Sequence, residues 1–300
     1  MKNLENNQAR IFEVGPRDGL QNESVILPIK TKVSLIEKLV DAGLKDVEIG
    51  SFVHPKWVPQ MANTGEVAKT IKKKKGVSYW ALVPNEKGLT RAIDAGLEHI
   101  AVFMSSSETH NRKNVNRSLA QSLDQLSRVI DKAVSRKCTV RAYISTVFGC
   151  PYEGAVDFSR VIEIADALFS FGAGQVSLGD TIGIGTPLQV KENCARIVDH
   201  FGSAEHFAIH LHDTHGLALT NAFAAFLEGF RNFDSSVGGL GGCPYAPGAP
   251  GNLRTEDLLK LLSSMEIETH VDRDQTDEIA SWLERSVGFD LSTRLSFQNL

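Results

Sequence analysis

Eight short runs rich in β-branched and aromatic residues alternate with amphipathic stretches along the chain, and this alternation is the strongest constraint on its fold. Apolar strands separated by helices predict a parallel sheet, and a strict eightfold repeat favours a closed TIM (β/α)8 barrel, an α/β fold. An open doubly wound sheet is the alternative, but its GxGxxG phosphate-binding pattern does not follow the first run. The predicted strands are 10–14, 46–49, 77–83, 99–104, 139–146, 174–178, 207–212 and 233–237.

The stretches between the predicted strands carry helical patterns. In TKVSLIEKLVDAG, apolar residues recur at helical spacing, and Gly43 stands where a helix C-cap prefers glycine. A similar pattern at 272–287 follows the eighth unit and predicts an extra C-terminal helix. We therefore expect a single catalytic barrel domain over 1–300, with a short polar tail at 1–9 and a C-terminal helical extension over 270–300.

The overall composition argues against several classes of partner. The chain has 300 residues and a net charge of -4, and no apolar run approaches the roughly 20 residues that cross a bilayer. We therefore expect neither a nucleic-acid nor a membrane partner. The first ten residues, MKNLENNQAR, lack the apolar core of a secretion signal. Four cysteines (Cys138, Cys150, Cys194 and Cys243) form no CxxC pair, which favours reduced thiols in a cytoplasmic protein.

In such a barrel, the loops that follow the strands form the catalytic face, whereas the loops that precede them stabilise the fold. The basic run at 72–75 precedes the third strand, so we interpret it as a solvated helix end. The segment EVGPRDGLQNE instead follows the first strand. It places Arg17 and Asp18 side by side at the catalytic face, either as an ordinary surface turn or as a catalytic pair beside a metal.

The segment AIHLHDTHG, at the end of the seventh strand, is the strongest local signal for a metal site. Because strand side chains alternate, His210 and His212 point to the same side of the strand. Two imidazoles at this spacing predict a pair of metal ligands, with two hydrogen-bonded core histidines as the alternative. His215 and Asp213 are weaker candidates.

A divalent cation needs further ligands, and carboxylate or amide oxygens suit magnesium and manganese. Asp18, Asp180 in SLGDTIG, and Asn252 after the eighth strand each lie where a strand ends on the catalytic face. Each of them could instead be a turn or cap residue. Their occurrence together at the ends of several strands favours a cation site.

Two more features lie on the catalytic face. Glu48 stands inside the apolar run VEIGSF, where an unpaired carboxylate is costly, so we expect Arg17 to pair with it and to be oriented by it. GGLGGCPYAPGAPGN follows the eighth strand and carries Cys243. A glycine-rich loop can close over a substrate, and a thiol on it can act as an acid–base group. A plain flexible loop or a phosphate cradle is the alternative.

Taken together, several motifs resemble the 3-hydroxy-3-methylglutaryl-CoA lyases, which belong to the DRE-TIM metallolyase superfamily. The motifs occur in the family's order along most of the chain: EVGPRDGLQNE, SFVHPKWVPQM, GCPYEG, SLGDTIGIGTP, HLHDTHG and GLGGCPYAPGAPGN. The RDGLQNE and GGLGGCPYA blocks are the most specific, whereas related condensing synthases share only the Arg-Asp and HxH elements.

The resemblance implies a TIM barrel that cleaves (S)-3-hydroxy-3-methylglutaryl-CoA to acetoacetate and acetyl-CoA in leucine degradation, as a homodimer using Mg2+ or Mn2+. It implies an arginine that stabilises the enolate, supporting carboxylates and an acid–base thiol. The residues that it assigns are Asp18, His210, His212 and Asn252 for the metal, and Arg17, Asp18, Glu48, Asp180 and Cys243 for catalysis. Either Asp18 or Asp180 would be the base.

The substrate side of the site is less defined. SSSETHNRKNVNRS follows the fourth strand, and its Arg112 and Lys113, with Arg117, could contact the phosphates of coenzyme A, or simply be solvated. Three other functions remain open: the same chemistry on a longer branched 3-hydroxyglutaryl-CoA, condensation of acyl-CoA with a keto acid, and acyl-CoA binding without catalysis.

Overall fold

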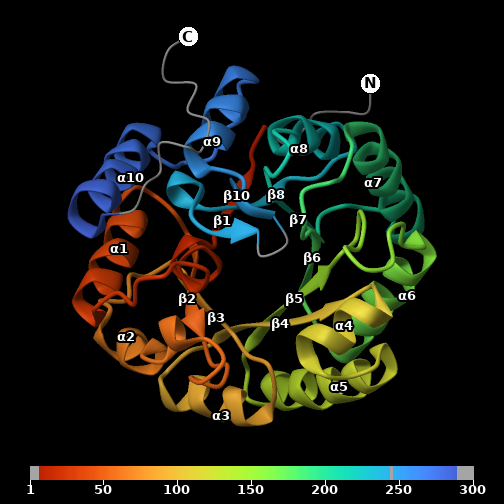
Figure 1. The fold of residues 1–300 in the computed structure, drawn as a ribbon, viewed down its shortest axis with the longest axis horizontal. Helices are drawn as coiled ribbons and strands as arrows, with labels where there is room; N and C mark the ends of the chain where they lie inside the picture. The colour runs from red at the N-terminus through yellow and green to blue at the C-terminus, as the bar shows by residue number, and fades with distance from the viewer. Residues whose placement is uncertain (1–6, 244–245, 289–300) are drawn as a thin grey trace.

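The computed structural model describes residues 7–243 and 246–288, and within them the predicted barrel is present (Figure 1). Eight parallel strands form one closed ring in chain order, and helices surround the ring. The barrel strands are β1 (Arg10–Glu13), β2 (Asp46–Ser51), β3 (Ser78–Leu82), β4 (His99–Ser105), β5 (Thr139–Ser145), β6 (Gln175–Asp180), β7 (Phe207–Leu211) and β8 (Asn232–Ser235). The helices are α1 (Ile29–Asp41), α2 (Thr64–Thr70), α3 (Glu86–Asp94), α4 (Glu108–Val115), α5 (Leu119–Ser135), α6 (Phe158–Phe171), α7 (Pro187–Phe201), α8 (Ala218–Leu227), α9 (Thr255–Ser264) and α10 (Arg273–Val287).

The ring closes between its first and last strands. Phe12 of β1 pairs with Asp46 of β2 on one side and with Asp234 of β8 on the other, in parallel register. All eight predicted strands are confirmed, with small shifts at their ends. The strand predicted at 233–237 ends two residues early. β8 stops at Ser235 because a short helical turn, in which Gly238 has a φ of 61°, follows directly. All carboxyl ends of the strands therefore open on one face.

Side-chain caps fix where several helices begin. Ser118 accepts a hydrogen bond from the amide of Gln121, whose side chain accepts one from the amide of Ser118, so a capping box starts α5. Asp272 accepts a bond from the amide of Gln275 and starts α10, the predicted extra helix. This helix packs against α1 and α9 and so joins the outer ring (Figure 1).

The apolar core lies between the strands and the helices, where side chains such as Leu35 and Leu39 of α1 are completely buried. The inside of the barrel is different, because it holds charged groups such as Arg141 and Asp234, each 1 % exposed. Buried charges persist only when they are paired and hydrogen-bonded. A second, small apolar cluster of Leu82, Ala101 and Tyr143 lies apart from the main core.

The segment before β1 pairs with the segment between α9 and α10. The amide of Ala9 donates to the carbonyl of Glu268, and the amide of Glu268 donates to the carbonyl of Asn7. Residues 1–6 and 289–300, the rest of the predicted tail and extension, lie outside the described residues. In the part of the chain that the structure describes, no helix combines the length and the apolarity that crossing a membrane requires.

Two minor predictions are confirmed. The basic run at 72–75 follows α2 and is exposed, as a solvated helix end should be. Cys138, Cys150 and Cys194 are buried free thiols, as predicted for reduced cysteines. Cys138 and Cys194 pack in the apolar core, whereas Sγ of Cys150 donates to Oγ of Ser107 at 3.0 Å.

Candidate active site

Arg17 and Asp18 lie in a π-helical turn, η1 (Gly15–Gly19), directly after β1. The amides of Arg17, Asp18 and Gly19 all donate to the carbonyl of Val14, at 3.1, 2.7 and 3.3 Å. The turn keeps both charged side chains at the barrel mouth, where the two residues are only 6 % and 8 % exposed. They form a buried charged pair, so an ordinary surface turn is excluded.

Arg17 links two carboxylates at the mouth. Its Nε donates to Oε2 of Glu48 at 2.7 Å, and its Nη1 pairs with Oδ1 of Asp18. Burial alone would lower the pKa of Arg17, but Asp18 and Glu48 outweigh burial, so the pKa lies above its ordinary value. The predicted ion pair between Arg17 and Glu48 is therefore confirmed, and it holds the guanidinium charged and in one orientation.

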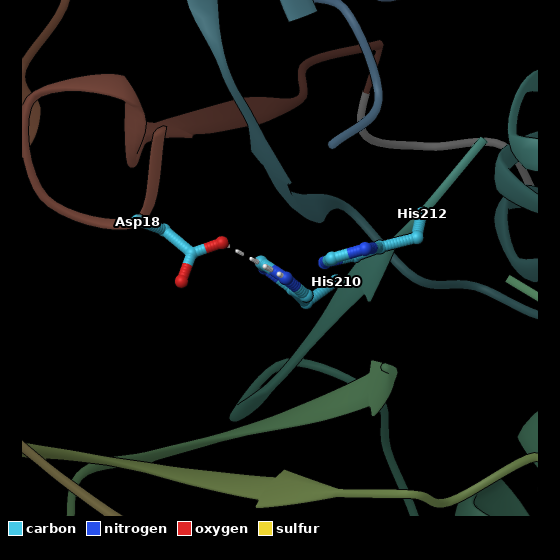
Figure 2. Close-up of side chains that lie close together, drawn as sticks. All are labelled: Asp18, His210 and His212. Carbon is cyan, nitrogen blue, oxygen red and sulfur yellow. Dashed lines mark ion pairs between the residues drawn. The ribbon is translucent and has the colours of Figure 1, made fainter. Parts of the chain in front are cut away.

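His210 and His212 lie at the end of β7 on the same side, as predicted, with ring centroids 5.3 Å apart (Figure 2). Asp18, His210 and His212 each offer one ligand atom, and these atoms lie within 4.8 Å of one another. Nε2 of His210 lies 3.9 Å from Oδ2 of Asp18 (Figure 2). The three side chains come from opposite ends of the sequence, and the closed ring brings them together.

The protonation states of this cluster suit cation binding. Burial would raise the pKa of Asp18, but Arg17 and the two histidines outweigh it and lower the pKa to about 2. Burial, assisted by His210, lowers the pKa of His212 to about 4. At neutral pH the carboxylate is therefore ionised and the His212 imidazole is neutral, which are the forms that bind metal ions.

Asn252 completes the cluster from the segment that follows β8. Its Nδ2 donates to Oδ2 of Asp18 at 2.9 Å and to the carbonyl of Leu240 at 3.0 Å. Among the described residues, neither its buried Oδ1 nor the buried Nδ1 of His212 has a hydrogen-bond partner. Buried polar atoms are normally satisfied. An amide oxygen and an imidazole nitrogen left free beside a carboxylate therefore fit a divalent cation such as Mg2+ or Mn2+.

Asp180, at the end of β6, is completely buried but lies outside this cluster of three. Its Oδ1 accepts the amide of Ile184 at 3.1 Å and its Oδ2 accepts the amide of Gly185 at 2.9 Å. Burial raises its pKa to about 6, although these hydrogen bonds and the charge of His210 oppose the rise. The carboxylate thus shapes the loop after β6 and titrates closer to neutrality than an ordinary aspartate does.

The glycine-rich segment begins with the turn η3 (Val237–Gly239) and continues as an antiparallel hairpin of β9 (Gly242–Cys243) and β10 (Ala246–Pro250). Gly241 has a φ of +102°, and a Cβ there would lie 2.8 Å from Nδ2 of Asn252, so only glycine lets the segment come this close to the cluster. The backbone of Cys243 lies in β9, whereas its side chain and residues 244–245 lie outside the described part. The acid–base role of Cys243 stays a prediction.

A cavity of about 700 Å³ opens at the mouth and is lined by Arg17, Asp18, His210 and His212. Lys113 of α4 also lines it, with Nζ 3.8 Å from the centroid of the Tyr152 ring. Arg112 does not line the cavity. It pairs on the exposed surface of α4, with its Nε 2.7 Å from Oε1 of Glu108.

Three buried residues below the mouth are not singled out by the sequence analysis, although they contact the predicted site. The hydroxyl of Tyr143 donates to Oε2 of Glu48 at 3.1 Å and accepts from Nη1 of Arg141 at 2.8 Å. Arg141 in turn pairs with Asp234. The signal was available, because Arg141 in TVRAYIS and Asp234 in NFDSS stand in apolar strands, as Glu48 does.

Known proteins of one family share this arrangement of fold and sequence. A family model described as HMGL-like matches residues 8–283. A Bacillus subtilis protein named hydroxymethylglutaryl-CoA lyase is 49% identical over 284 residues, which cover 95% of each chain. A Pseudomonas aeruginosa protein named 3-hydroxy-3-isohexenylglutaryl-CoA/hydroxymethylglutaryl-CoA lyase is 47% identical over 88% of each chain.

A solved structure supports the same assignment. It is an HMG-CoA lyase from Acinetobacter baumannii in complex with coenzyme A and 3-methylmalate, with a TM-score of 0.91 and 35% identity. The match covers 100% of this chain and 99% of that one. The chain therefore belongs to the HMGL-like family, as an enzyme of the hydroxymethylglutaryl-CoA lyase type.

Proposed function

We propose that this enzyme cleaves the C2–C3 bond of (S)-3-hydroxy-3-methylglutaryl-CoA and releases acetoacetate and acetyl-CoA. The observation that carries the proposal is the buried Arg17–Asp18 pair, which faces the same cavity as His210 and His212. In the reaction the C3 hydroxyl loses its proton and becomes a ketone. The electron pair of the C2–C3 bond moves onto the thioester, and the resulting enolate takes a proton at C2.

Asp18, His210, His212 and Asn252 would hold a divalent cation, Mg2+ or Mn2+. When bound, such an ion supplies Lewis acidity at the hydroxyl oxygen that loses its proton. The unpartnered Oδ1 of Asn252 and Nδ1 of His212 support this role. A ligand set of two oxygens and two imidazole nitrogens can hold either ion.

Arg17 would stabilise the negative charge that develops on the thioester oxygen. Its pairing with Glu48 and Asp18 fixes the guanidinium before the substrate arrives, so no reorganisation is needed during the reaction. Removing one preorganised donor of this kind typically costs about 10²–10³ in kcat. Glu48 would act through Arg17, as the carboxylate that orients it.

Two carboxylates could take the proton from the hydroxyl. The pKa of Asp180, at about 6, is the closer of the two to neutrality, which suits a base. The pKa of Asp18, at about 2, suits a cation ligand better than a base. Replacing Asp180 with asparagine would distinguish them. If Asp180 is the base, the wild-type rate should fall at acidic pH as Asp180 becomes protonated, and this fall should be missing from the pH–rate profile of Asp180→Asn.

Cys243 would protonate the enolate carbon, from a hairpin that begins beside Asn252. The first experiment is therefore the release of acetoacetate from HMG-CoA with Mg2+, with EDTA, and by Cys243→Ala. We expect metal-dependent release that collapses in the variant. The HMG-CoA assignment fails if the folded, metal-loaded wild type releases no acetoacetate. Normal turnover by Cys243→Ala would remove only the thiol from the mechanism.

Coenzyme A would enter along α4. Lys113 lines the cavity and can meet a phosphate or the pantetheine chain, whereas the ion pair of Arg112 with Glu108 on the surface gives Arg112 weaker support. Lys113→Gln should raise KM for the acyl-CoA and leave kcat nearly unchanged. A contact that is equally strong in the bound substrate and in the transition state affects binding alone. Arg112→Gln is the matched control on the same helix.

A second candidate substrate is a longer branched 3-hydroxyglutaryl-CoA. The Pseudomonas aeruginosa relative carries an isohexenyl substrate in its name. In this chain the cavity wall includes the apolar side chains of Val53, Val58, Leu82 and Phe103. Comparing kcat/KM for 3-hydroxy-3-isohexenylglutaryl-CoA and HMG-CoA decides which acyl group the cavity prefers.

The setting of the reaction is also a proposal. The resemblance supports a place in leucine degradation and a homodimer, which light scattering of the purified protein would test. The free, buried thiols of Cys138, Cys150 and Cys194 support a reducing compartment, the cytoplasm.

A further inference from the structure

A chain of buried polar contacts runs below the mouth and ends on His210. Asp234 of β8 is 1 % exposed and pairs with His210 across the β7–β8 ladder. Its Oδ2 lies 3.3 Å from Nδ1 of His210 and accepts a hydrogen bond from Oγ of Ser177 at 2.9 Å. Its Oδ1 pairs with Arg141. Three different strands therefore hold this one carboxylate.

The partner of Asp234 is itself fixed. Nε of Arg141 donates to Oε1 of Gln175 at 2.7 Å, Nη1 donates to the hydroxyl of Tyr143, and the guanidinium carbon lies 3.9 Å from the centroid of the Phe12 ring. Gln175, Tyr143 and Phe12 therefore fix the guanidinium that holds Oδ1 of Asp234, and Oδ2 of Asp234 faces Nδ1 of His210.

This contact determines how His210 presents its other nitrogen. A carboxylate that faces Nδ1 favours the neutral tautomer with the hydrogen on Nδ1. The lone pair then lies on Nε2, which is the nitrogen that faces Asp18 at 3.9 Å. Metal-binding histidines commonly have such a carboxylate partner, which sets the tautomer and the ring orientation. His212 differs, because no carboxylate of the described residues lies within ion-pair distance of its ring, whereas Oδ2 of Asp234 lies 3.3 Å from Nδ1 of His210.

We propose that Asp234 is a positioning residue for the candidate cation site. It holds the imidazole of His210 in the Nδ1–H tautomer with Nε2 directed at Asp18, and Arg141 and Ser177 hold Asp234 in turn. The inference rests on the proposed function only for the presence of the cation. The tautomer itself is a property of the metal-free protein.

The first test is the affinity for Mn2+, measured by electron paramagnetic resonance on the full chain. Asp234→Asn presents an amide that can donate to Nδ1 and so favours the wrong tautomer. We expect Mn2+ to bind about 10–100-fold more weakly to this variant. Ser177→Ala keeps the carboxylate but removes one of its hydrogen bonds, so it should weaken Mn2+ binding less than Asp234→Asn does. Equal affinity in the wild type and Asp234→Asn would overturn the proposal.

Asp46→Asn is the matched control for the loss of a buried carboxylate. Asp46 is completely buried inside the same barrel, and its carboxylate accepts hydrogen bonds from Arg10 and Trp80 at the end opposite the mouth. This variant should lose stability without losing Mn2+ affinity. An equal loss of affinity in both asparagine variants would mean that Asp234 acts through general stability, and the proposal would fall.

The second test needs no variant of Asp234, so it holds even if that variant fails to fold. Nitrogen-15 NMR of the metal-free wild type at pH 8 reports the tautomer of each histidine, and His210→Gln identifies the signal of His210 by its loss. We expect the hydrogen on Nδ1. A hydrogen on Nε2 would overturn the proposal. If the wild type bound no Mn2+, the proposed function would fail, and the tautomer would still decide this inference.

Discussion

The two ends of the barrel each hold a buried carboxylate against an arginine, but among the described residues only the mouth brings three possible metal ligands within 4.8 Å of one another. At the end where β2 begins, Asp46 accepts Nε of Arg10 at 2.5 Å, Nη2 of Arg10 at 2.8 Å and Nε1 of Trp80 at 3.0 Å. At the mouth, Asp18 meets Arg17 in the same way, but its neighbours His212 and Asn252 each keep a buried atom without a partner.

This difference separates a structural ion pair from a binding site. The charge of Asp46 is fully balanced by side chains of the same barrel, so nothing further is required. Around Asp18, buried atoms of His212 and Asn252 have no partner among the described residues, and leaving buried polar atoms unpaired costs about 1–3 kcal/mol each unless a ligand satisfies them. Among the described residues, more buried polar atoms are therefore without a partner at the mouth than at the base, as expected of a site that binds a cation.

The most direct test of this difference replaces Asp18 and Asp46, one at a time, with asparagine. Asp18→Asn should lower kcat for acetoacetate release by at least about 10³-fold, because it removes a cation ligand and frees Arg17. Asp46→Asn should keep turnover and lower the free energy of unfolding by about 1–2 kcal/mol, since its partner Arg10 is half exposed. Steady-state kinetics measures the turnover of each variant, and urea unfolding measures its free energy of unfolding. Equal losses of turnover would refute the distinction.

A smaller effect is expected at the arginine of the mouth. Arg17→Lys should lower kcat and kcat/KM alike, by about 10²–10³-fold, because lysine cannot pair with Glu48 and Asp18 through one planar fork. Arg128→Lys, on the exposed surface of α5, is the control and should behave as the wild type does. A variant Arg17→Lys that raises KM but keeps kcat would assign Arg17 to binding only.

The pH dependence of stability gives the next effect in size. Burial raises the pKa of Asp180 from 3.8 to about 6, so the folded protein keeps this proton where the unfolded chain has lost it. The aspartate should therefore destabilise the fold progressively as pH rises from about 4 to about 6, by up to about 3 kcal/mol relative to Asp180→Asn. Urea unfolding in EDTA measures this difference. Parallel pH profiles for both proteins would show that no such shift exists.

The smallest effect is expected on the face opposite the mouth. Lys74 pairs with Asp41, and both side chains are more than half exposed. Lys74→Ala should change the free energy of unfolding by less than about 0.5 kcal/mol and leave turnover unchanged. A clear loss of activity would show that the basic run at 72–75 takes part in function after all.

Sequence patterns predict the barrel well because each unit repeats one local rule: an apolar strand, a helix with a periodic apolar face, and glycine between them. The approach of Asp18, His210 and His212 to one another could be predicted because parallel strands in a closed ring must bring their carboxyl ends together. Asn252 follows for the same reason. The boundary of β8 could not be predicted, since it depends on how the following glycines turn.

The support beneath the site was not predictable in the same way. Arg141 and Asp234 stand out as charges in apolar strands, but a sequence does not say which residue lies across a barrel interior. Only the closed ring shows that Arg141 on β5 reaches Asp234 on β8 and that Asp234 meets His210. Arg112 shows another limit of sequence-based prediction. It lies in the segment expected to contact coenzyme A, but its side chain pairs with Glu108 on the exposed surface of α4.

The central claim, that the mouth binds a divalent cation through Asp18 and its neighbours, is tested most directly by calorimetric titration with Mn2+. The wild type and Asp46→Asn should each bind one ion per chain with similar affinity. Asp18→Asn should bind at least about 100-fold more weakly while remaining folded. Equal binding by Asp18→Asn, or no binding by the wild type, would contradict the account.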